Sequence, residues 1–85
     1  MNRINKKVIL LEDNKDLSQQ TKKLLETIFL NPVRVYSSVD EALEGFMENL
    51  PDLIVCDIQV IGDQNGLDFI EKAKILKSNV KSLII

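Results

Sequence analysis

Histidine is absent from this chain of 85 residues, and cysteine occurs only once. Without histidine there is no Ser-His-Asp triad, and most zinc sites are excluded because they use imidazole ligands. A single cysteine cannot close an internal disulfide. Cys56 lies within an apolar run, so we interpret it as a small buried hydrophobic residue rather than a reactive thiol.

The sequence also has little net charge and no leader-like segment. A formal net charge of -2 gives no general attraction to nucleic acid or to an anionic membrane. No charged start followed by an apolar stretch and a cleavage site precedes Val8, so a cytoplasmic location is expected. At this length and with 45% hydrophobic residues, we expect one soluble globular domain, residues 1–85, and no second domain.

Two continuous apolar runs each end in acid. Val8–Leu11 is followed by Glu12 and Asp13, and Leu53–Cys56 is followed by Asp57. Runs without polar alternation are typical of parallel strands that helices cover on both faces. If these two strands are neighbours, three carboxylates meet at one edge of the sheet, where a cation or a shared proton must relieve their repulsion. The pattern therefore predicts a hard-metal site.

Three helices and two further strands are predicted around these runs. The first helix follows a cap at Asn14 and ends near Phe29, and the second opens with a capping box of Ser38 and Glu41. The third follows Gly66 and ends at residues 78–79. The further strands are Val33 to Tyr36 and Val80 to Ile85. Each helix has an expected apolar face: in the first Leu17, Thr21, Leu24, Leu25 and Ile28, in the second Ala42, Leu43, Phe46, Met47 and Leu50, and in the third Leu67, Ile70 and Ala73. We interpret Phe46 and Met47 as core residues.

Strands and helices thus alternate from the first strand to the fourth, which predicts an α/β fold with a doubly wound parallel sheet. Right-handed crossovers place helices on both faces, and ligands bind such sheets at the carboxyl ends of the strands. Nucleotide-binding proteins of this class place glycine directly after the first strand, where this chain has Glu12-Asp13-Asn14. A nucleotide-binding domain is therefore the weaker alternative, and glycosidase-like paired carboxylates lack any sign of a substrate cleft.

The chain resembles the receiver domain of two-component response regulators. The resemblance rests on three segments, residues 8–14 (VILLEDN), 51–57 (PDLIVCD) and 65–70 (NGLDFI). It implies a flavodoxin-like receiver fold of five strand and helix units, of which this chain carries the first four strands and three helices.

The resemblance also implies a phosphoacceptor site that uses Mg²⁺. Asp57 would take a phosphoryl group from a sensor histidine kinase, a phosphotransfer protein or a small phosphodonor. Asp13 and Asp57 would bind Mg²⁺ directly, Glu12 would reach it through water, and the backbone carbonyl of Gln59 would complete the protein ligands. Such a domain acts as a signalling switch and not as an enzyme, with at most self-catalysed phosphotransfer and dephosphorylation.

Three departures from the family pattern are visible. Ile61 replaces the usual proline four residues after the phosphoacceptor, and the loop to Gly66 is one residue longer than the common form. The family's Ser/Thr at the end of the fourth strand and its Lys after the fifth have no counterpart in these residues. We therefore expect the N-terminal portion of a receiver, truncated after the fourth strand, whether natural or a fragment.

Two classes of function follow from these observations. In the first, phosphorylation of Asp57 biases a conformational equilibrium. In the second, the chain is a non-switching, receiver-like module that binds a metal or a protein. In either class the apolar strand Val80 to Ile85 forms an exposed edge, which predicts self-association through strand pairing. Output domain and cognate kinase are not encoded in these residues.

Overall fold

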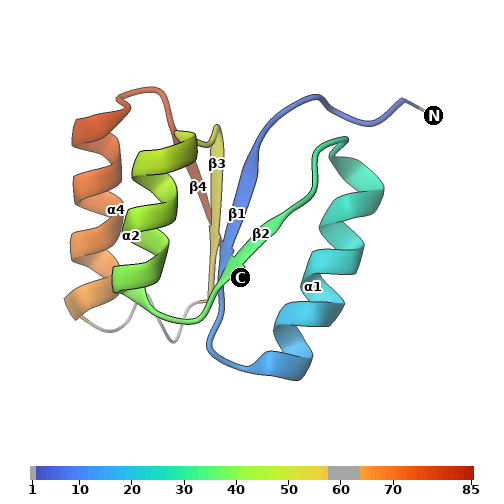
Figure 1. Cartoon of the computed structure of the whole chain (residues 1–85), viewed down its shortest axis with the longest axis horizontal. Helices are drawn as coiled ribbons and strands as arrows, with labels where there is room; N and C mark the ends of the chain where they lie inside the picture. Colours follow the sequence, from blue (N-terminus) through green and yellow to red (C-terminus); the bar gives the residue numbers. More distant parts are fainter. Residues whose placement is uncertain (1, 58–63) are drawn as a thin grey trace.

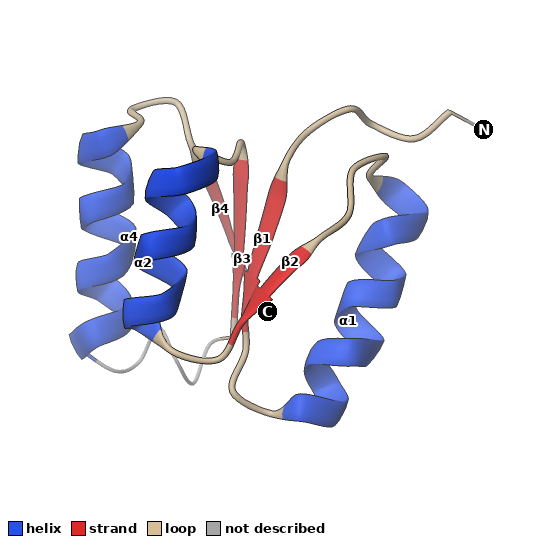
Figure 2. Ribbon diagram, in the orientation of Figure 1, coloured by secondary structure: helices blue, strands red, loops and turns tan. Residues whose placement is uncertain are grey.

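The chain folds as four strands that alternate with three helices, over the part that this computed structural model describes, residues 2–57 and 64–85 (Figures 1 and 2). The strands are β1 (Val8–Leu11), β2 (Arg34–Tyr36), β3 (Leu53–Cys56) and β4 (Lys81–Ile84). The helices are α1 (Lys15–Ile28), α2 (Val39–Asn49) and α4 (Gln64–Leu76). The predicted alternation is confirmed, and each predicted strand lies within a residue or two of its expected bounds.

All four strands are parallel and form one sheet in the order β2-β1-β3-β4. The central pair is β1 with β3, in which Val8 lies opposite Leu53 and Leu11 opposite Cys56. Every residue of β1 is buried, because this strand has neighbours on both sides and helices on both faces. The sheet is therefore the doubly wound parallel sheet predicted from the apolar runs.

Helices cover the two faces unequally. In Figure 1, α2 and α4 lie together against one face and α1 lies against the other. Alternate residues of β1 pack into the core on opposite faces of the sheet. Ile9 and Leu11 pack with Phe46 of α2 and Phe69 of α4. Val8 and Leu10 pack on the opposite side with Leu25 of α1. The rings of Phe46 and Phe69 meet edge to face, with centroids 6.4 Å apart and planes at 89°, and this contact joins α2 to α4.

The predicted helix caps are confirmed at both sites. The side chain of Asn14 accepts a hydrogen bond from the N–H of Leu17 at 2.9 Å. Ser38 Oγ accepts from the N–H of Glu41 at 3.3 Å. Each cap satisfies one of the amide donors that a helix leaves unpaired in its first turn, and so fixes where the helix begins.

Part of the predicted apolar face of α1 and α2 is exposed, which corrects the sequence-based assignment. Leu17, Leu24 and Ile28 are 43%, 63% and 43% exposed, whereas Leu25 is buried. Among the described helices α1 lies by itself on its face of the sheet, so the flanks of its apolar stripe are left uncovered. Met47, predicted to be core, is 61% exposed, because it lies one position beyond the fully buried Phe46 and so points away from the sheet.

The core face of α4 differs in part from the prediction. Leu67, which was expected on the apolar face, is 46% exposed. Phe69 is fully buried in its place, together with Ala73 on the following turn. The larger aromatic ring removes more apolar surface from water than the leucine would, and its spacing to Ala73 matches one helical turn. The prediction was wrong for Leu67 and missed Phe69, whereas Ala73 is buried and Ile70 packs against the core as expected.

Asp52 links four elements at the amino end of the sheet. Its Oδ2 accepts from the backbone N–H of Lys7 at 2.9 Å, and its Oδ1 lies 3.0 Å from Nζ of Lys77 after α4. Its backbone N–H donates to the carbonyl of Lys7 at 2.9 Å, and its carbonyl accepts from Lys81 at 3.0 Å. These contacts lower the pKa of the Asp52 carboxyl, chiefly through the Lys7 N–H and then through Lys77.

We predict that Asp52→Asn lowers the free energy of unfolding by about 0.5–1 kcal/mol at pH 7, a modest loss because the Asp52 side chain is 37% exposed and water screens the ion pair. A carboxyl whose pKa is lowered on folding stabilises the folded state at pH values above its ordinary pKa. This stabilisation is lost as the pH falls through the pKa of the folded state. The free energies of unfolding of the wild type and the variant, measured in urea at pH 7 and below pH 4, should therefore converge in acid. Glu48→Gln, an exposed acid at the end of α2, is the control, and equal stability of wild type and Asp52→Asn at pH 7 would contradict the role of Asp52.

Candidate functional site

The pairing of β1 with β3 brings two of the predicted acids to one edge of the sheet. Leu11 and Cys56 are opposite one another in the register, so the residues that follow them, Glu12 and Asp57, leave neighbouring strand ends. The N–H of Glu12 donates to the carbonyl of Tyr36 at 3.0 Å, and the N–H of Asp57 donates to the carbonyl of Leu11 at 3.3 Å. The backbone of both acids is therefore held by the sheet.

Glu12 is a buried carboxylate, with only 2% of its surface exposed. Its Oε2 accepts a hydrogen bond from the backbone N–H of Asn14 at 3.1 Å. Its Oε1 is buried and accepts no hydrogen bond from the described residues. Since nearly all buried polar atoms in proteins are paired, an open acceptor of this kind is typical of a site that takes a cation, a proton or water.

Burial raises the pKa of the Glu12 carboxyl above its ordinary value. The Asn14 N–H opposes this shift, whereas the Asp57 carboxyl raises the pKa further through hydrogen bonding and charge, and Asp13 adds a smaller effect. Folding thus favours protonated Glu12: its ionised form costs stability at neutral pH, and the cost is relieved as pH falls through the raised pKa. A cation would relieve the same cost without a proton.

The four residues predicted to form the site differ in where the structure places them. Glu12 and Asp57 are brought together, with Glu12 buried and Asp57 half-buried, while Asp13 is exposed at the start of the loop before α1. Gln59 and the departure at Ile61 lie outside the described residues. Within residues 2–57 and 64–85, no set of three acidic or sulfur side chains is arranged to hold a metal ion. The described acids therefore form a close pair with Asp13 beside it, rather than a closed cage.

Cys56 precedes the phosphoacceptor candidate and is fully buried, as predicted. Burial, with smaller effects from the charges of Asp57 and Glu12, raises the pKa of its thiol to about 11. The thiol is therefore protonated at neutral pH and is a poor nucleophile. This leaves the carboxylates as the reactive groups at this edge of the sheet.

A glycine on α2 supports the site and was not singled out from the sequence. A Cβ added at Gly45 would overlap the hydroxyl and ring of Tyr36, so a larger residue here would force the Tyr36 side chain to move. Tyr36 is also the residue whose carbonyl holds the N–H of Glu12. A glycine inside a helix lowers helix stability by about 1 kcal/mol relative to alanine. The presence of this unfavourable residue inside a predicted helix was the sequence signal for a packing role.

Comparison with known proteins places the chain in a family. The response regulator receiver domain family matches residues 8–85. Among solved structures, the anti-anti-sigma factor PhyR from Bartonella quintana aligns with a TM-score of 0.78 and 19% identity, over 98% of this chain and 34% of that one. The response regulator PhyR from Brucella abortus aligns with a TM-score of 0.77 and 15% identity over the same shares. The chain thus spans about a third of the length of these proteins.

Two further findings accompany this match. No curated protein sequence matches the chain significantly. In the part of the chain that the structure describes, no helix is long and apolar enough to cross a membrane. The family match covers nearly the whole sequence, and the sheet order and the acids at the ends of β1 and β3 agree with the resemblance seen in the sequence. The chain belongs to the response regulator receiver domain family of two-component signalling.

Proposed function

We propose that this receiver domain is a phosphoacceptor and that Asp57 is the residue that is phosphorylated. The observation that carries the proposal is the pairing of half-buried Asp57 with buried Glu12, whose Oε1 accepts no hydrogen bond from the described residues. Cys56 beside it is held as a neutral thiol, and the chain has no histidine. Asp57 is then a carboxylate nucleophile that the sheet holds in place and that is partly accessible at this edge.

The donor set fits a hard divalent cation such as Mg²⁺. Carboxylate oxygens are its preferred protein ligands, and the buried Glu12 carboxylate lacks a positive partner among the described residues. Asp13, Asp57 and the carbonyl of Gln59 would hold the ion, with Glu12 acting through water. When bound, Mg²⁺ neutralises the charge that builds up on the transferring phosphoryl group.

The chemical step takes place between the Asp57 carboxylate and a phosphodonor. A carboxylate oxygen of Asp57 attacks the phosphorus atom, and the bond from phosphorus to the donor breaks as the new O–P bond forms. With a histidine kinase or a phosphotransfer protein, the leaving group is the imidazole nitrogen of the donor, which keeps the electron pair. The product is an acyl phosphate that carries about two negative charges and biases a conformational equilibrium of the domain. A cytoplasmic location is part of this proposal.

Incubation with acetyl phosphate and MgCl₂ should add one phosphoryl group to the wild type in an intact-mass measurement. Asp57→Asn should show no adduct, because an amide is not a nucleophile of this kind. Asp52→Asn is the matched control, since it changes an aspartate at the other end of the same strand and should still be modified. An adduct that persists in Asp57→Asn would refute this residue as the acceptor.

A second function is favoured by one observation, the absence among the described residues of three acidic or sulfur groups arranged to hold a metal. On this alternative the domain is a non-switching, receiver-like interaction module. The same mass measurement separates the two functions. No adduct on the wild type, in a preparation that unfolds cooperatively in urea, would support the interaction module.

We also propose that the chain self-associates through β4, which is an edge strand of the sheet. Lys81 and Ile85 direct their N–H groups to β3, so by alternation Ser82 and Ile84 present theirs to the open edge. Leu83, Ile84 and Ile85 are 48%, 44% and 49% exposed. Unpaired backbone groups beside exposed apolar side chains are the features that favour pairing with another strand.

Sedimentation velocity over a range of dilutions should show a concentration-dependent dimer of the 85-residue chain. Ile84→Lys should shift the equilibrium to monomer, because a charge on the edge strand opposes pairing. Ile75→Lys is the control, since Ile75 is 82% exposed on α4 and lies away from the edge. The proposal fails if the wild type is a monomer at all concentrations or if both variants weaken the dimer equally.

A further inference from the structure

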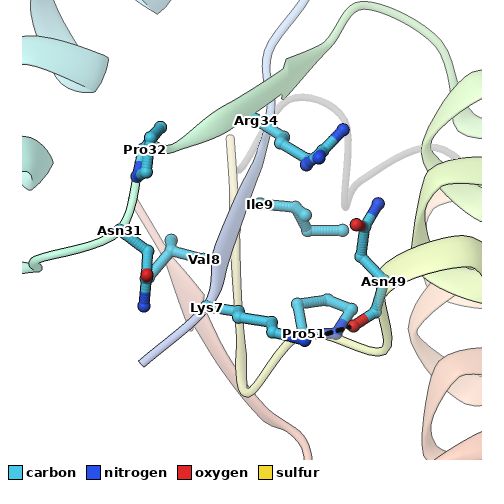
Figure 3. Close-up of a pocket in the computed structure, with 8 residues that line it drawn as sticks. All are labelled: Lys7, Val8, Ile9, Asn31, Pro32, Arg34, Asn49 and Pro51. Atoms are coloured by element: carbon cyan, nitrogen blue, oxygen red, sulfur yellow. Dashed lines mark hydrogen bonds between the residues drawn. The ribbon is translucent and has the colours of Figure 1, made fainter. Parts of the chain in front are cut away.

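A depression lies at the amino end of the sheet, the end opposite the acids. It has a volume of about 270 Å³ and lies between the starts of β1 and β2 and the end of α2 (Figure 3). Lys7 lines it from just before β1, and Ile9 and Arg34 line it from β1 and β2. Asn49 and Pro51 line it from the end of α2 and the turn after it. We call this depression the amino-end groove. Its volume lies just below the roughly 300–1,000 Å³ typical of sites for drug-sized ligands, so it suits a smaller molecule.

The residues that line the amino-end groove carry two positive charges, on Lys7 and Arg34, and no negative charge. Figure 3 shows the Arg34 side chain extended from β2 across the groove toward Asn49. Arg34 is exposed, and its guanidinium makes no hydrogen bond or ion pair with the described side chains. A guanidinium offers a planar fork of donors that matches a carboxylate or a phosphate, and here that fork is available.

Two hydrogen-bond acceptors beside the groove, the Asn49 carbonyl and the Asp52 carboxylate, are already paired. The carbonyl of Asn49, at the negative end of the α2 dipole, accepts from Nζ of Lys7 at 3.4 Å. Asp52, next to Pro51, is held by the Lys7 N–H and by Lys77 Nζ at 3.0 Å. These pairings reduce the repulsion that an incoming anion would meet, and they leave the charge of Arg34 without a counterpart.

The floor of the groove is apolar. Val8 and Ile9 from β1 and Pro51 after α2 form its base and are buried, so they offer a ligand almost no open surface. In Figure 3 the Ile9 side chain lies between Arg34 and Pro51. A ligand in the groove would therefore be held by the charges of Arg34 and Lys7 rather than by contact with these apolar side chains.

We propose that the amino-end groove binds a small organic anion through a carboxylate or phosphate placed on Arg34 and Lys7. This site is independent of Asp57, which lies at the opposite end of β3 from Pro51. Binding here requires no divalent cation, so it can be tested with the acidic edge free of metal.

The test is a titration of the ¹⁵N-labelled chain with sodium benzoate and, separately, with phenyl phosphate, in EDTA and at matched ionic strength. The two probes separate a carboxylate from a phosphate ligand. We expect saturable shifts at the amides of Val8, Ile9, Arg34 and Asn49, with a dissociation constant on the order of 1 mM for at least one probe. Arg34→Gln should weaken binding about tenfold, the effect of losing one charge-assisted hydrogen-bonded contact.

Two controls decide the outcome. Lys23→Gln removes an exposed cation on α1 and should leave the affinity unchanged. Benzyl alcohol has the same ring without the charge and should bind at least tenfold more weakly than benzoate. The proposal is overturned if neither anion gives saturable shifts, if the shifts centre on Glu12 and Asp57, if Arg34→Gln binds as the wild type does, or if benzyl alcohol binds as well as benzoate.

Discussion

The parallel pairing of β1 with β3 is the constraint on which the rest of the structure depends. Both strands are apolar throughout and lie at the centre of the sheet, so a shift of register would move their side chains between the two core layers. The register that satisfies both layers is the one that places Leu11 opposite Cys56. Glu12 and Asp57 then follow at adjacent strand ends, and the burial of the core brings two like charges together at the site.

The sheet also has a charge polarity from one end to the other. Acids lie at the carboxyl ends of β1 and β3, and cations lie at the amino end on Lys7, Arg34 and Lys81. Asp52 is the exception at the amino end, and its pairing with Lys77 and the Lys7 N–H makes it part of the fold. The proposed cation site at one end and the groove lined by cations at the other are two consequences of one arrangement.

The strands, the caps and the position of the acids could be predicted because each depends on neighbours in the sequence. Apolar runs and the Asn14 and Ser38 caps are local signals of this kind. Burial on the helices was predicted less well, since the exposure of Leu24 and Met47 and the burial of Phe69 depend on which helices share a face. The packing of Tyr36 on Gly45 and the amino-end groove join segments far apart in the chain, and no local pattern indicates them.

The central claim is that Glu12, Asp13 and Asp57 act together as a site for a divalent cation, and urea unfolding in MgCl₂ and in EDTA tests it most directly. A ligand at about 100 times its dissociation constant stabilises the folded state by about 2.7 kcal/mol, and the wild type should show a gain of this order. Most of the gain should be lost in Asp13→Asn and Asp57→Asn and kept in Asp16→Asn, which changes an exposed acid in the first turn of α1. An unchanged stability of the wild type in MgCl₂, or an equal gain in all four proteins, would contradict the account.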